Sequence, residues 1–70
     1  MSIVDYCVLV QRAVKNSKPT ECSNEDFSDW FSDTGGASIA LGYALEGRDG
    51  KALNIAEKLA EKYALEFSKL

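Results

Sequence analysis

The chain has 70 residues, 46% of them hydrophobic, and a formal net charge of −3 at pH 7. This length predicts one small domain over residues 1–70, and the negative balance disfavours nucleic acid as a partner, because binding to phosphates needs clustered Lys and Arg. No apolar run is long enough to cross a bilayer, and no basic segment precedes residues 3–10 as it would in a signal peptide. We therefore expect no membrane contact and a cytoplasmic location.

The first predicted element is a helix over residues 3–16. Its apolar side chains recur at steps of three and four residues, which is typical of a helix with one buried face: Ile3, Tyr6, Cys7, Val10, Ala13 and Val14. A buried strand over residues 3–10 stays open as an alternative, because this stretch is rich in β-branched residues. Pro19 ends the element, since proline cannot continue a helix.

A short second helix is predicted over residues 24–32. Ser23 is the expected N-cap, and Glu25 and Asp26 suit the positive end of the helix dipole. We expect Gly35 and Gly36 to end this helix, because adjacent glycines readily adopt the left-handed conformation found at helix C-termini.

Two further helices are predicted to form an αα-hairpin. The first, over residues 37–46, is almost uncharged, and Gly42 inside it suggests close approach of another helix. A turn at residues 47–50 leads to a long amphipathic helix over residues 51–69, which presents one broad apolar face: Ala52, Ile55, Ala56, Leu59, Ala60, Tyr63, Ala64 and Phe67. The predicted fold is an all-α bundle of three to four helices.

The side-chain inventory predicts that the protein is not an enzyme. The chain has no His, the commonest general base and a common metal ligand. Cys7 and Cys22 cannot close a zinc site alone, and whether they pair stays open. A calcium loop beginning at Asp29 would have Thr34 in place of its glycine and Ala40 in place of its glutamate. We therefore expect no metal and no cofactor.

The whole negative surplus of the chain lies in residues 21–33, where five acids surround three aromatic residues. On a helix, the acids would share about a third of the circumference, while Phe27 and Phe31 would face the core. A solvated acidic face is one interpretation, and a docking face is the other. A buried Trp30 would favour the first. The candidate partner-binding residues are Glu25, Asp26, Asp29, Trp30 and Asp33.

These observations predict a small acidic protein–protein interaction module. We expect a regulator or inhibitor, of a phage or accessory type, that binds the basic surface of a protein through residues 25–33. Two alternatives stay open: a helix-turn-helix-like regulator of nucleic acid, and a helical domain that binds a small metabolite. The apolar surface also allows a homodimer, joined along the alanines of the last helix or along residues 37–46.

Overall fold

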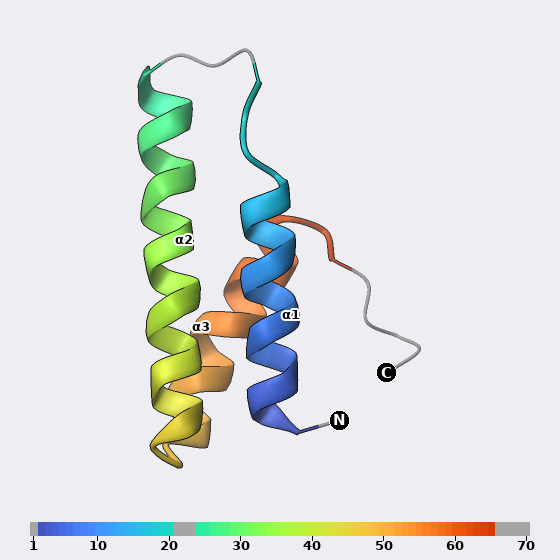
Figure 1. Cartoon of the computed structure of the whole chain (residues 1–70), viewed down its shortest axis with the longest axis vertical. Helices are drawn as coiled ribbons and strands as arrows, with labels where there is room; N and C mark the ends of the chain where they lie inside the picture. Colours follow the sequence, from blue (N-terminus) through green and yellow to red (C-terminus); the bar gives the residue numbers. More distant parts are fainter. Residues whose placement is uncertain (1, 21–23, 66–70) are drawn as a thin grey trace.

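The computed structural model describes residues 2–20 and 24–65, and these fold into three helices without a strand (Figure 1). They are α1 (Ile3–Asn16), α2 (Asn24–Leu45) and α3 (Asp49–Lys62). α1 and α2 lie side by side, α3 crosses behind them, and each helix packs against both others. The all-helical prediction is confirmed, with three helices in the described part of the chain. None of these helices is long and apolar enough to span a membrane.

α1 follows the predicted boundaries, and the strand alternative for residues 3–10 is wrong. The Ser2 hydroxyl accepts a hydrogen bond from the Asp5 backbone N–H at 3.1 Å and so caps the helix. Cys7, Val10 and Val14 recur on one face and are fully buried. Burial raises the pKa of the Cys7 thiol, which is free. Cys22 and Ser23 lie outside the described residues, as do the predictions made for them.

α2 is one continuous helix of 22 residues, so the predicted break at Gly35 and Gly36 is wrong. Each glycine costs a helix about 1 kcal/mol relative to alanine. Packing offsets that cost, because Trp30 on one side of the glycines and Ala37 and Ala40 on the other all contact the same core. At Gly36 an added Cβ would lie 3.9 Å from Leu59 Cδ1, so α3 passes close by.

The turn from α2 to α3 is a Schellman motif, and the predicted hairpin forms around it. Gly47 has a φ of 81°, in the left-handed region. The Arg48 N–H donates to the carbonyl oxygen of Tyr43 at 2.8 Å, and the Gly47 N–H to that of Ala44 at 3.2 Å. These bonds satisfy carbonyls that the end of α2 would otherwise leave unpaired.

α3 ends at Lys62, not at residue 69, so α2 is the longest helix instead. A second Schellman motif stops it. Ala64 has a φ of 52°, and the Leu65 N–H donates to the carbonyl oxygen of Ala60 at 2.9 Å. Glycine usually occupies this position, and an alanine there gives no sequence signal. The end of the predicted helix, with Phe67, lies outside the described residues.

The core is made largely of small side chains. In the described part of the chain, ten hydrophobic residues are buried: Cys7, Val10, Val14, Ala37, Ala40, Ala44, Ala52, Ala56, Leu59 and Ala60. Six of them are alanines, so the helices approach one another closely. Ala52, Ala56 and Ala60 are therefore buried against α1 and α2 and are not available to join two copies, whereas Ala64, beyond the end of α3, is exposed. Gly42 faces the other way: no described atom lies within 4 Å of an added Cβ, so residues 2–20 and 24–65 do not make the close approach expected there.

Candidate functional site

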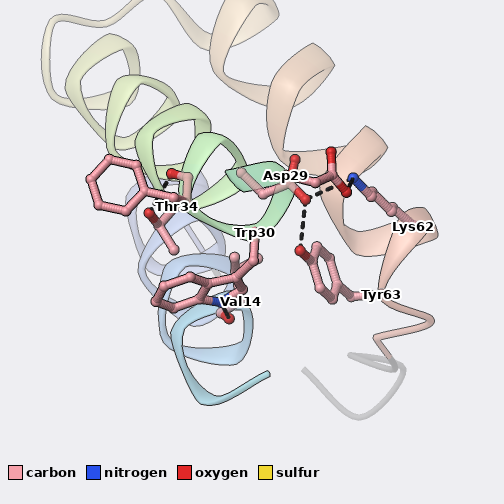
Figure 2. A network of polar contacts seen from close by, with 8 residues as sticks. Val14, Asp29, Trp30, Thr34, Lys62 and Tyr63 are labelled. Carbon is pink, nitrogen blue, oxygen red and sulfur yellow. Dashed lines mark hydrogen bonds and ion pairs between the residues drawn. The ribbon is translucent and has the colours of Figure 1, made fainter. Parts of the chain in front are cut away.

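Trp30 joins the beginning of α2 to the end of α1. Its indole Nε1–H donates to the carbonyl oxygen of Val14 at 2.8 Å (Figure 2). The ring is half-buried, so it stabilises the bundle and still borders the surface. Lys18 Nζ lies 5.8 Å from the centroid of this ring and 5.7 Å from that of Phe27. An ammonium group therefore already sits in cation–π contact at this site.

Two of the predicted acids bind the end of α3. Lys62 Nζ lies 2.7 Å from a carboxylate oxygen of both Asp29 and Asp33. The Tyr63 hydroxyl donates to Asp33 Oδ2 at 2.6 Å (Figure 2). The Asp33 side chain is only 14% exposed, whereas that of Asp29 is 63% exposed. Asp33 therefore acts as a link between helices, and Asp29 remains accessible to a partner.

This network shifts the titration of both α3 residues. Hydrogen bonds to Asp29 and Asp33 raise the pKa of Lys62, because they stabilise its charged form. Burial, together with the hydrogen bond to Asp33, raises the pKa of Tyr63 to about 12. Both groups therefore keep their protons well into the alkaline range, and the network stays intact at neutral pH.

Phe27 and Phe31 of α2 face solvent, so the prediction that they anchor the helix to the core is wrong. Phe27 is 40% exposed and Phe31 is 65% exposed, and their rings stack with centroids 6.4 Å apart. The cause is the continuity of α2. Its buried face, set by Ala37 and Ala40, continues through Asp33 and Trp30 at helical spacing. This phase turns both phenyl rings away from the buried face, Phe27 to its flank and Phe31 farther round the helix.

A groove of about 350 Å³ opens where α1 ends, α2 begins and α3 ends. Its lining residues are Ser17, Pro19, Asp26, Asp29, Trp30, Lys62 and Tyr63. Of the five predicted site residues, the groove thus brings together Asp26, Asp29 and Trp30. Asp33 does not line the groove but contacts two residues that do, Lys62 and Tyr63. Glu25 is exposed and lies outside the lining.

No sequence pattern predicted the α3 side of the groove. Lys62 lies 33 residues from its partner Asp29, and no local spacing predicts such a pair. Tyr63 was predicted on the apolar face of the last helix, where it does pack against the core, but its hydroxyl has a polar partner. A buried tyrosine usually needs such a partner, which was the one general clue.

The groove is suited to a cationic group. Its lining has two carboxylates, Asp26 and Asp29, against one ammonium, Lys62, so it is net negative. The carboxylates and the aromatic face both attract positive charge, and Arg and Lys side chains combine these two contacts. Across residues 2–20 and 24–65, no three His, Cys, Asp or Glu side chains gather in a group that could hold a metal ion. No protein-family model, curated protein or solved structure matches the chain. The geometry of the groove is therefore the basis for a functional proposal.

Proposed function

We propose that the protein is a small non-enzymatic interaction module, a regulator or inhibitor that acts in the cytoplasm. It binds a basic segment of a partner protein in the groove at the beginning of α2. The observation that carries this proposal is the position of Lys18, whose ammonium lies over the rings of Trp30 and Phe27. Lys18 and Phe27 lie beside the groove and not in its lining, and Trp30 belongs to both contacts. An Arg or Lys side chain of a partner would take the place of this internal cation on the Trp30 ring.

The acids around the groove supply the attraction. Asp29 lines the groove together with Trp30 and keeps an exposed carboxylate, and Glu25 lies exposed on the preceding turn of α2. Asp33 holds Lys62 and Tyr63 in position and so fixes one wall. A partner guanidinium could stack on the indole ring and bind the Asp29 carboxylate at the same time. An exposed cation–π contact contributes about 0.5–1 kcal/mol, and the ion pair adds a similar amount.

The size of the groove sets the expected affinity. A volume of about 350 Å³ accommodates one basic side chain and parts of its neighbours. Contacts this small give weak complexes, so we expect a dissociation constant of about 10–1,000 µM for a short peptide. A whole partner would bind more tightly if it also covers the exposed Phe27 ring.

The test is an NMR titration with an arginine-containing peptide. The chain has one Trp, so a single indole N–H signal reports on the groove. We expect that signal to shift saturably, and Asp29→Asn to weaken the binding by about tenfold. The matched control is Glu57→Gln, which removes an exposed charge from α3 outside the groove lining.

A peptide with citrulline in place of arginine keeps the shape and removes the charge, so it should not bind. Equal shifts with both peptides, or equal binding by the Asp29→Asn variant, would contradict the proposal. An unmoved indole signal throughout the titration would contradict it as well.

A further inference from the structure

The outer side of α2 is a long uncharged surface that the described part of the chain leaves uncovered. No charged residue occurs from residue 34 to residue 45. Phe31 is exposed, and so are Ile39 (55%) and Leu45 (69%). α1 and α3 lie together on one side of α2, so the opposite flank has no described helix beside it (Figure 1). Exposed apolar surface of this extent is typical of an interaction site.

Two glycines interrupt this outer side, and the packing of the chain does not account for them. Gly35 and Gly42 are two helical turns apart and therefore lie on the same side of α2. A Cβ added at either position would meet no described atom within 4 Å. Glycine is unfavourable inside a helix, and close approach of another backbone is a common reason for it.

We propose that a second copy of the chain covers this surface, with the two α2 helices antiparallel. Two-fold symmetry makes every contact occur twice. Phe31 of one copy would then lie level with Gly42 of the other, and Leu45 with Ser28. Phe31, Ile39 and Leu45 thus each meet a smaller residue of the second copy, namely Gly42, Thr34 and Ser28, so the surface is complementary to itself in this alignment. Phe27 lies beside the groove and is not part of this contact.

Charge supports the antiparallel direction. The turn after α2 carries Arg48, whose own contact with Glu46 is long, at 3.5 Å, and exposed. In the alignment that places Phe31 level with Gly42, this turn lies beside the beginning of the other α2. The helical register ends with α2 at Leu45, so this alignment places Arg48 near the exposed acid Glu25 without fixing a direct pair. A parallel pair would instead place acid beside acid at the beginning of both helices.

The available area also suffices. An aromatic side chain covers on the order of 150–250 Å², and isoleucine and leucine lie near the lower end of that range. The exposed parts of Phe31, Ile39 and Leu45 therefore amount to roughly 300–400 Å² in each copy, by the same measure. With the strip around the glycines included, two copies would bury about 1,000 Å², the lower limit for a specific interface.

The test is the mass in solution, measured by sedimentation equilibrium between about 1 µM and 1 mM, the range of weak specific association. We expect the unmodified chain to form a dimer in this range. Gly42→Glu should make it a monomer with unchanged helical circular dichroism, because open space surrounds the added side chain. Phe31→Ser, at an exposed ring, should weaken the dimer at least tenfold.

The matched control is Asn54→Glu, which adds the same charge at an exposed position of α3 and should leave the dimer intact. A chain that stays monomeric up to about 1 mM, or a dimer that survives Gly42→Glu, would overturn the proposal. Assembly beyond a dimer would overturn it too, because a two-fold contact closes. Asp29→Asn should not change the mass, so this test is separate from that of the groove.

Discussion

The indole N–H of Trp30 donates to the carbonyl oxygen of Val14 and so fixes the beginning of α2 against the last turn of α1. The same ring forms a wall of the groove. Trp30 therefore combines the two roles that the sequence presented as alternatives, since it contributes to the packed bundle and also borders the surface where a partner could bind. The residue beside it, Phe31, is the exposed one.

This contrast predicts different effects of truncating the two rings. Trp30→Ala should lower the free energy of unfolding by about 2–3 kcal/mol, because it removes half-buried apolar surface and a hydrogen bond. Phe31→Ala should change it by less than about 0.5 kcal/mol. Urea denaturation of the dilute monomer measures both. Equal losses would show that Phe31 anchors the helix after all.

The Asp33–Tyr63 contact predicts a loss of stability at alkaline pH. The pKa of Tyr63 is raised from 10.0 to about 12 in the folded chain. Folding therefore favours the protonated phenol, and its contribution is complete below pH 10 and disappears as the pH rises to 12. The raised pKa of Lys62 acts in the same direction.

The melting temperature should accordingly fall between pH 10 and pH 12, and Tyr63→Phe should reduce the slope of that fall. Tyr43→Phe is the matched control, because its hydroxyl is not part of the network around Asp33, and it should keep the slope. An ultraviolet titration of the folded chain should show a tyrosine that ionises near pH 12. A slope unchanged by Tyr63→Phe would contradict the assignment.

The two Schellman motifs predict opposite effects of exchanging Gly and Ala. Ala64→Gly should stabilise the chain by about 0.5–1 kcal/mol, because glycine adopts a positive φ without steric strain. Gly47→Ala should destabilise it by about 1 kcal/mol for the converse reason. Thermal unfolding of the two variants checks both signs. A loss on Ala64→Gly would mean that the end of α3 is not held in the left-handed conformation.

Removal of the Lys18 charge should change the affinity of the groove for the arginine peptide. If its ammonium occupies the site of a partner cation, Lys18→Gln should tighten the binding of the arginine peptide by about threefold to tenfold. Lys15→Gln removes an equal charge from the exposed end of α1 and has no cation–π contact with these rings, so it should have a smaller effect. If Lys18→Gln weakened the binding of the peptide, the idea that a partner cation takes the place of the Lys18 ammonium would be contradicted.

Sequence periodicity predicted a helix correctly where the apolar spacing was regular and a nearby residue such as proline or glycine marked the end of the helix. α1 follows from the spacing of Cys7, Val10 and Val14, and the hairpin from Gly47. The helix end predicted at Gly35 does not occur, because packing on either side of the glycine outweighs the low helix propensity of glycine. The same error made the predicted orientation of Phe27 and Phe31 wrong. A separate short helix could rotate so that these rings face the core, whereas in one continuous helix the residues after Gly36 determine which side faces the core.

The groove depended on contacts that no local pattern contains. Its walls come from three helix ends, and Lys62 reaches Asp29 only because α3 stops where it does. Ala64 at a position that usually requires glycine conceals that stop. The acidic side of the groove and Trp30 were therefore predictable from composition, and the wall formed by Lys62 and Tyr63 was not.

The alanines of the core set the distance between the helix axes. With Ala40 and Ala56 almost fully buried, the side chains at the contact keep the helix axes close together. A larger residue at Ala56 would push α3 outward, and a displacement of about 1–2 Å would already take Lys62 beyond hydrogen-bond reach of Asp29. The width of the groove is thus set by methyl groups in the interior, so a substitution far from the surface can open or close it.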